Sequence, residues 1–160
     1  LVYQENGRYF NISLPLQADL RAVLFIPDFT MSTAKARHIL PAKVSRTDAV
    51  FNLSRVSLLT LVLTNGKLEY LKIATQDRLH KPARQSMFPA MENIFKAALE
   101  AGALGAFLSG AGSTILAFTE GESLSGEIGT AMQNAAIRAG IRGRVQVARP
   151  SVQGVHRIPL

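Results

Sequence analysis

The chain has 160 residues, of which 48% are hydrophobic and 18% are charged, and it contains no cysteine. A chain of this size can bury one sizeable core, and its modest charge content argues against disorder, so we expect one globular domain over residues 1–160. The lack of cysteine excludes disulfides and thiolate metal sites. No apolar run in the sequence reaches the roughly 18 residues of a membrane span.

The formal net charge of +7 has three interpretations. The first is that the chain binds nucleic acid, the second is that it binds an anionic small molecule, and the third is that it is the basic part of a longer and more acidic protein. Nucleic acid is the weakest of these, because the arginines are scattered and the aromatic residues, at 7%, do not interleave with them. The sequence starts at Leu1 without a signal-peptide pattern, so we expect a fragment of a longer protein.

The first part of the sequence predicts two strands and a short helix. Residues 3–10 and 20–26 have strand character, and the nearly continuous apolar run in the second is typical of an interior strand. A turn is expected at 28–31. Ser32 then caps a predicted helix over 33–40, since its hydroxyl can accept a hydrogen bond from an unpaired backbone N–H.

Helices dominate the middle of the sequence. We expect a long amphipathic helix over 45–63 and a shorter one over 67–74, with an Asn-Gly pair ending the first. Residues 77–89 contain two prolines and are expected to be irregular, and another helix is expected over 91–101. The apolar positions near helical spacing in the long helix are Val50, Leu53, Val56, Leu59 and Leu63.

The last part predicts strands at 103–108 and 114–119, a helix at 124–139, and strands at 145–148 and 155–158. The mixed order of strands and helices favours an α+β domain in which helices pack on one face of an antiparallel sheet. These final elements, together with an earlier strand, follow the split β-α-β plan of ferredoxin-like folds.

A glycine-rich turn joins two of these strands. Its residues are Ser109, Gly110, Ala111 and Gly112. The glycines permit positive φ angles, and successive N–H groups in such a turn can bind an anion. The turn matches neither a P-loop, which needs Gly-Lys-Ser/Thr, nor the dinucleotide fingerprint, which needs a third glycine. Taken by itself, it favours a tight β-hairpin whose glycines serve geometry alone.

Two stretches place polar and cationic side chains where they can bind a carboxylate. Thr33 and Arg37 are four residues apart and share one face of the predicted helix, and the Arg37 guanidinium can grip a carboxylate with two parallel bonds. In the irregular loop, Arg84 offers a second guanidinium to the same anion, Asp77 can orient an arginine, and His80 can orient a helix or the loop. Taken singly, these side chains favour solvated or structural roles, and His80 as a general base ranks below a structural His80. The sequence shows no metal-ligand cluster.

In combination, these stretches resemble the homoserine kinases of the galactokinase, homoserine kinase, mevalonate kinase and phosphomevalonate kinase superfamily. Four blocks follow the family's order and extend the resemblance from about residue 20 to residue 147. The blocks are Met31-Ser32-Thr33-Ala34-Lys35-Ala36-Arg37, Ser45-Arg46-x-Asp48-Ala49-Val50-x-Asn52, Asp77-Arg78-Leu79-His80-x-Pro82-x-Arg84 and Leu108-Ser109-Gly110-Ala111-Gly112-Ser113-Thr114.

The resemblance implies a kinase that transfers the γ-phosphoryl of ATP to the side-chain hydroxyl of L-homoserine, as a step of threonine biosynthesis. It implies that this chain is the C-terminal, substrate-side domain. The residues implied to bind the substrate are Thr33, Arg37, Arg84 and Gly110, those beside the phosphate are Ser109, Gly110, Ala111 and Gly112, and those in supporting roles are Asn52, Asp77 and His80.

The resemblance also implies that an N-terminal half binds ATP and Mg²⁺, because the family's Gly-Leu-Gly-Ser-Ser loop does not occur in these 160 residues. We therefore expect this chain alone to be inactive. A cytoplasmic location (plastid in a plant), a homodimer and competition by threonine at the carboxylate site are further expectations. Three alternatives stay open. They are another kinase of the superfamily, such as a mevalonate-type enzyme, a basic nucleic-acid-binding module, and a non-catalytic subunit that docks onto a separately encoded ATP-binding half.

Overall fold

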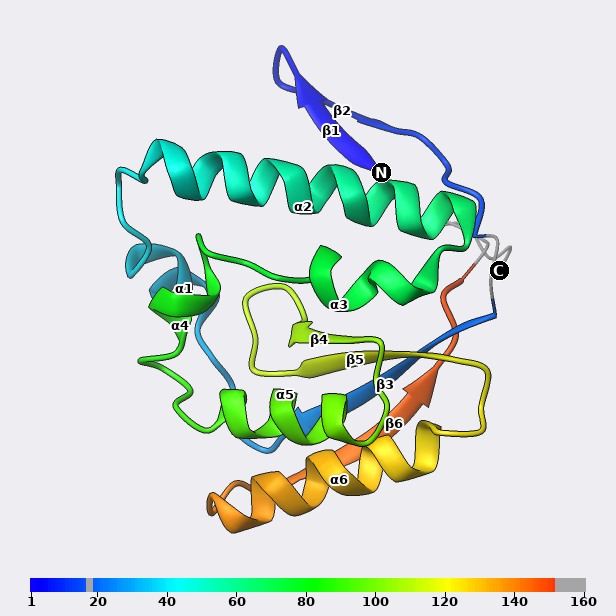
Figure 1. The fold of residues 1–160 in the computed structure, drawn as a ribbon. Helices are drawn as coiled ribbons and strands as arrows, with labels where there is room; N and C mark the ends of the chain where they lie inside the picture. The colour runs from blue at the N-terminus through cyan, green and yellow to red at the C-terminus, as the bar shows by residue number, and fades with distance from the viewer. Residues whose placement is uncertain (17–18, 152–160) are drawn as a thin grey trace, which may run out of the picture.

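The computed structural model describes residues 1–16 and 19–151. An antiparallel sheet of four strands in the order β4-β5-β3-β6 forms its centre (Figure 1). The strands are β3 (Leu20–Pro27), β4 (Gly105–Leu108), β5 (Ile115–Glu120) and β6 (Gly143–Ala148). This order, with one helix before β4 and one before β6, is the predicted split β-α-β arrangement, and the expected α+β class is confirmed. The strand predicted at 155–158 lies outside the described residues.

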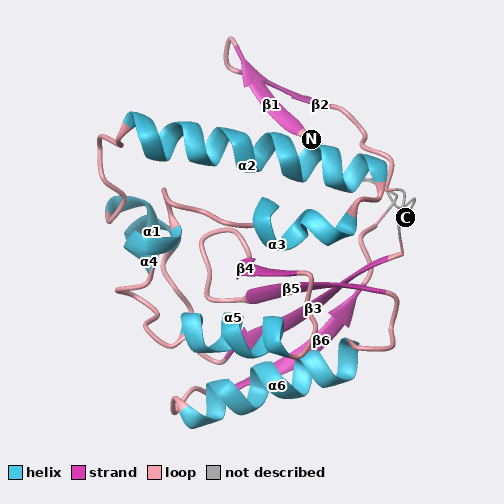
Figure 2. Ribbon diagram, viewed as in Figure 1, coloured by secondary structure: helices cyan, strands magenta, loops and turns pink. Residues whose placement is uncertain are grey.

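Two helices, α5 (Met91–Glu100) and α6 (Ser125–Arg138), cover one face of the sheet (Figure 2). Every third or fourth residue of α5 is apolar and buried, which gives that helix one face for the sheet. The main core lies between these helices and the sheet, and its largest fully buried side chains are Val23, Phe25, Phe88, Met91, Ile94, Ile115, Ile128 and Met132.

A second, smaller cluster lies on the other face of the sheet. It joins α2 (Arg46–Asn65), the 3-10 turn η1 (Leu68–Tyr70) and α3 (Leu71–Ala74) to Phe118 of β5. Successive side chains of a strand point to opposite faces, and the neighbouring Ala117 belongs to the main core. Helices α5 and α6 thus take the face we expected, and α2 and α3 add a layer beside β4.

The helix ends are capped, and the caps at Ser32 and Gly66 were predicted. The Ser32 hydroxyl accepts a hydrogen bond from the Lys35 N–H at the start of α1 (Thr33–His38). The Ser45 hydroxyl accepts one from the Asp48 N–H at the start of α2. Gly66 ends α2 with a φ of 68°, a left-handed conformation that glycine adopts without steric cost.

Two local predictions were wrong, and a third, that of a helix at 67–74, was incomplete. The strand expected at 3–10 is a hairpin, β1 (Val2–Glu5) and β2 (Arg8–Asn11), because Asn6-Gly7 adopts positive φ angles and turns the chain back. The helix expected at 67–74 begins as η1 and only then becomes α3. The loop expected at 77–89 contains the helical turn α4 (Lys81–Arg84), which Pro82 permits because it lies in the first turn.

Helix α2 is apolar on more than one side. Val62 is its buried residue, whereas Val50, Leu53 and Val56, which we expected on a buried face, are 59–68% exposed. Hydroxyl groups on the helix donate to backbone carbonyls three or four residues earlier, which leaves the outward face with few free polar groups; they belong to Ser54, Ser57, Thr60 and Thr64. No helix in the described part of the chain, α2 included, has both the length and the hydropathy to cross a membrane.

Two leucine substitutions distinguish the packed from the unpacked side of this layer. Leu71 is fully buried in the smaller cluster, whereas Leu53 is 68% exposed. We expect Leu71→Ala to lower the free energy of unfolding by about 2–5 kcal/mol through lost burial and a cavity. The matched Leu53→Ala should change it by less than about 0.5 kcal/mol. Urea unfolding of both variants measures the difference, and equal losses would contradict this packing.

Candidate functional site

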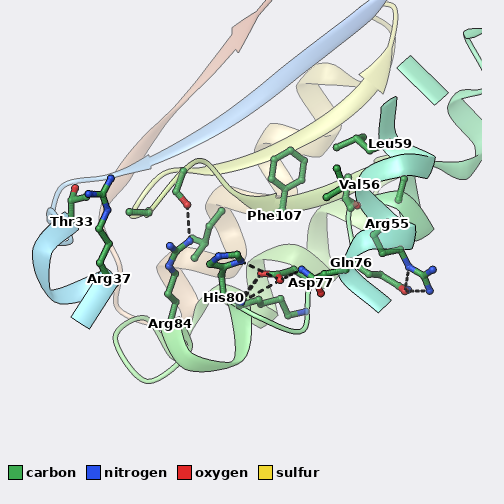
Figure 3. Close-up of a pocket in the computed structure, with 18 residues that line it drawn as sticks. Thr33, Arg37, Arg55, Val56, Leu59, Gln76, Asp77, His80, Arg84 and Phe107 are labelled. Atoms are coloured by element: carbon green, nitrogen blue, oxygen red, sulfur yellow. Dashed lines mark hydrogen bonds and ion pairs between the residues drawn. The ribbon is translucent and has the colours of Figure 1, made fainter. Parts of the chain in front are cut away.

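A cavity of about 680 Å³ opens between α1, α2, α4 and the turn that joins β4 to β5. Figure 3 shows its walls, which include all but one of the residues that the sequence pointed to. The predicted residues that line it are Thr33, Arg37, Asn52, Asp77, His80, Arg84, Gly110, Ala111 and Gly112. Ser109 does not line the cavity, and its N–H is bonded within the turn to the Thr114 carbonyl at 2.9 Å. Segments far apart in sequence therefore converge on one site.

Phe29 explains how these segments meet. It follows β3 and precedes α1, and its ring contacts the buried Phe88 edge-on, with the ring centroids 5.1 Å apart. Phe88 comes shortly after α4, so this contact brings α1 and α4 together. The Ser113 hydroxyl donates to the Phe29 carbonyl at 2.7 Å and attaches the glycine-rich turn to the same point.

The α1 wall supplies Thr33 and Arg37. Ala36 is fully buried and anchors the helix, which leaves Thr33 and Arg37 exposed on the side that faces the cavity. Arg37 makes no ion pair or side-chain hydrogen bond with another described residue, so its guanidinium keeps five donors for an anion. Arg37 and Arg84 line the same cavity, as the sequence predicted (Figure 3).

Arg84 reaches across the cavity floor to the glycine-rich turn. Its Nη1 donates to the Gly110 carbonyl at 2.9 Å, and its Nε is buried without a hydrogen-bond partner among the described residues. A buried N–H without an acceptor costs free energy, so this edge of Arg84 suits a bound anion. The Gly112 N–H is committed to the Ser109 carbonyl, which leaves the N–H groups of Gly110 and Ala111 as the turn's available donors.

Asp77 organises the loop that carries Arg84. Its Oδ1 accepts hydrogen bonds from Asn52 Nδ2 at 2.7 Å and from the Leu79 N–H at 2.8 Å, and its Oδ2 accepts one from the Lys81 N–H at 2.8 Å. Asn52 in turn accepts a bond from the Arg78 N–H at 2.9 Å. Helix α2 is thereby joined to the start of α4, whose first N–H groups would otherwise lack acceptors.

These contacts set the charge of Asp77. Partial burial works to raise its pKa, but the hydrogen bond from Asn52 and those from the N–H groups of Leu79, Lys81 and His80 outweigh it and lower the pKa to about 2. The carboxylate is therefore ionised over the whole physiological range. The His80 Nδ1 lies 3.4 Å from Asp77 Oδ1, which gives this half-exposed histidine the structural role we ranked first.

Other lining residues were not identified from the sequence. They are Arg55, Val56, Leu59, Gln76 and Phe107. The signal was present for those on α2, because positions three, four and seven residues beyond Asn52 share its helical face. Phe107 and Gln76 had no such signal, since the contact of β4 with α3 is long-range.

The acids of the site do not form a metal centre. Asp77 is the sole acid among the lining residues, and its oxygens are occupied by the bonds given above. Nowhere in residues 1–16 and 19–151 do three or more His, Asp or Glu side chains form a group that could hold a metal ion. The cavity is instead a cationic pocket with one apolar wall.

Comparisons with known proteins agree with this geometry. Residues 63–138 match the family described as GHMP kinases C terminal. A homoserine kinase of Persephonella marina is 40% identical over 139 residues, which cover 87% of this chain and 45% of that protein. One of Trichormus variabilis is 43% identical over 133 residues, which cover 83% of this chain and 44% of that protein. The chain spans about half the length of the curated relatives it matches.

The comparison with solved structures agrees with the sequence comparisons. The crystal structure of a homoserine kinase from Cytophaga hutchinsonii has a TM-score of 0.82 and 32% identity, over 86% of this chain and 44% of that one. The L. major mevalonate kinase in complex with R-mevalonate has a TM-score of 0.64 at 20% identity, over 94% of this chain and 48% of that one, which shows a shared fold alone. The chain therefore carries a GHMP kinase C-terminal domain.

The hydrogen bonds of Asp77 predict a pH-dependent contribution to stability. At pH 7, Asp77→Asn should lower the free energy of unfolding by about 1–3 kcal/mol, because partly buried N–H groups lose a charged acceptor. A folded pKa of about 2, below the ordinary 3.8, means that the Asp77 contribution is complete above about pH 4 and is lost as the pH falls toward 2.

The measurement is urea unfolding of the unsubstituted protein and the Asp77→Asn variant between pH 7 and pH 2. The difference between their free energies of unfolding should decrease as the pH falls toward 2. The control is Asp28→Asn, because Asp28 is exposed and its side chain has no partner among the described residues. A gap that stays constant down to pH 2 would contradict the assigned role of Asp77.

Proposed function

We propose that this chain is the substrate-binding half of a homoserine kinase, which phosphorylates the side-chain hydroxyl of L-homoserine with ATP. The observation that carries the proposal is the convergence of Arg37, Arg84 and Thr33 on one cavity beside the Gly110 turn. The proteins named homoserine kinase that resemble this chain support the choice of substrate. A cytoplasmic location and a homodimer belong to the same proposal.

Each residue has a role in holding the substrate. Arg37 and the buried Nε edge of Arg84 bind the α-carboxylate with charge-assisted hydrogen bonds. Thr33 donates its hydroxyl to the substrate, and the Gly110 and Ala111 N–H groups face the reacting end. Asp77 and Asn52 hold the segment that carries Arg84. Phosphoryl transfer depends mainly on such positioning and on charge stabilisation, so a rigid cationic pocket suits it.

In the reaction, the homoserine hydroxyl oxygen forms a bond to the γ-phosphorus while the bond from that phosphorus to the ADP oxygen breaks. The hydroxyl proton is released. The described lining residues do not fit a Mg²⁺ site, because Asp77 is their sole acid and is saturated by hydrogen bonds. We therefore assign ATP and Mg²⁺ to a part of the protein that these residues do not include.

A chimera tests the substrate roles. In it, this chain replaces the 139 matching residues of the Persephonella marina relative. Arg37→Ala and Arg84→Ala should each raise the KM for L-homoserine about ten-fold or more, since a charge-assisted hydrogen bond contributes about 1.5–3 kcal/mol. Lys35→Ala is the control, because Lys35 is an exposed cation of α1 outside the cavity. Unchanged KM values in both arginine variants would refute the proposed clamp.

A second assay tests the choice of substrate. Turnover of the chimera is measured with a panel of substrates that includes mevalonate, and a preference for mevalonate would reveal a mevalonate-type enzyme.

The chain by itself should be inactive, because the Gly-Leu-Gly-Ser-Ser loop expected to hold ATP does not occur in it. The assay is ADP release from ATP in the presence of L-homoserine, with the chimera as the positive control. We expect no homoserine-dependent release from the purified chain. Turnover by the chain alone would mean that it binds ATP without that loop. The proposal that another part of the protein binds ATP would then be wrong.

A further inference from the structure

The proposed binding site makes no direct use of one buried hydroxyl group in the glycine-rich turn, residues 109–114. Ser113 is 8% exposed and does not line the cavity. Its Oγ donates to the Phe29 carbonyl at 2.7 Å, across 84 positions of the chain. A bond between segments this far apart in sequence holds tertiary structure, because its loss leaves a partly buried carbonyl without its donor.

Ser113 and Arg84 attach the glycine-rich turn to two different walls of the cavity. Among the described residues, their side chains make the two side-chain hydrogen bonds between the turn and other parts of the chain. Arg84 lies on α4 and donates to the Gly110 carbonyl at 2.9 Å. Ser113 bonds to the segment that leads into α1, which carries Arg37. The turn is thus a bridge between the helices that carry the two arginines.

Packing around Phe29 and Met31 defines where this bridge is attached. A Cβ atom at Gly112 would lie 3.0 Å from the Met31 Sδ, so the turn rests directly on the Met31 side chain. Met31 belongs to the main core and precedes the cap of α1. The Phe29 ring packs edge-on against Phe88, shortly after α4, while the Phe29 carbonyl accepts the hydrogen bond from the turn.

We infer that Ser113 is a positioning residue, which fixes the separation of the Arg37 and Arg84 guanidinium groups through the turn. The inference rests on the proposed function, in which both groups bind one carboxylate. Charge-assisted hydrogen bonds are directional, so two guanidinium groups grip one carboxylate best at a set spacing. Without the Ser113 hydroxyl, the turn stays bonded to Arg84 but loses its hydrogen bond to the segment before α1, and the spacing is less constrained.

The competing explanation is that Ser113 only stabilises the fold. Ser125 provides the matched control, because it is 4% exposed and its Oγ donates to the Gly121 carbonyl at 3.5 Å. It lies at the start of α6 and does not line the cavity. Substitution of either serine by alanine removes a buried hydroxyl that donates to a backbone carbonyl, and only the substitution of Ser113 detaches the turn.

The first experiment is steady-state kinetics of variants of the chimera. Ser113→Ala should raise the KM for L-homoserine about five-fold or more and change kcat less, because a loosened clamp weakens binding of the substrate. Ser113→Thr, which keeps the hydroxyl, and Ser125→Ala should both leave KM within about two-fold. Thermal unfolding confirms that each variant is folded. Equal rises in KM for the two alanine variants would overturn the positioning role.

A double substitution tests whether Ser113 acts through Arg84. In an Arg84→Ala background, Ser113→Ala should raise KM by less than about two-fold, because the turn then has no second guanidinium to hold in place. A purely structural serine would have the same effect with or without Arg84. An undiminished rise in KM in the Arg84→Ala background would therefore overturn the inference.

A measurement without substrate separates this inference from the proposed function. The chain contains no cysteine, so spin labels attach only to introduced ones. Lys35→Cys on α1 and Ser109→Cys in the turn, both at exposed positions, carry the labels. Ser113→Ala should broaden the distribution of distances between the labels in electron paramagnetic resonance, and Ser125→Ala should leave it unchanged.

The two failures have different signatures. Identical label distributions with and without the Ser113 hydroxyl would overturn the inference whatever the substrate is. A broadened distribution, together with arginine variants that leave KM unchanged, would refute the proposed clamp and would support the attachment of the turn by Ser113.

Discussion

The Asp77 carboxylate is the constraint on which the site depends. One side chain accepts hydrogen bonds from Asn52 on α2 and from the successive N–H groups that lead into α4. These bonds fix the position of α4, and α4 carries Arg84, which in turn holds the Gly110 carbonyl. Three walls of the cavity are therefore connected through one ionised group. Its low pKa is a sign of the same connection, because each donor that positions the loop also stabilises the charge.

The two faces of the sheet have different roles in forming the cavity. The main core under α5 and α6 gives the domain its stability and contributes little to the cavity. The α2 layer packs through a smaller cluster and supplies Asn52, Arg55 and the apolar wall. The proposed carboxylate-binding residues lie on the short helices α1 and α4 and on the glycine-rich turn, which are held by a few hydrogen bonds and by Phe29, while the split β-α-β core supports them.

Charge explains why such a cavity suits the proposed phosphoryl transfer. Arg84 is held by a backbone carbonyl, and Arg55 is held by an amide and an aromatic ring, so both stay in place without carboxylates that would cancel their charge. Fixed, unneutralised donors stabilise an anion at little reorganisation cost. The net charge of +7, which as a bare number also suggested nucleic acid, is thereby explained in part by a small cavity rather than by an extended basic surface.

The sequence by itself determined much of the local structure and pointed to nine of the residues that line the cavity. Ser32 and Gly66 marked helix ends because capping is a contact between near neighbours, and Thr33 and Arg37 shared a face because four residues make about one helical turn. The family resemblance added Asn52 and suggested the roles of Asp77 and Arg84. The Asn6-Gly7 turn is an equally local signal, because its positive φ angles belong to two adjacent residues.

Only the tertiary structure decided which side of α2 is buried and what Arg55 faces. The apolar residues of α2 lie all around the helix, so its period could not distinguish the face against α3 from the exposed face with Leu53. Likewise, no sequence spacing could show that Gln76 and Phe107 line the same cavity as Arg55, because this needs β4 to lie beside α3. Long-range packing sets these neighbours, and it follows from how whole elements bury their surfaces together.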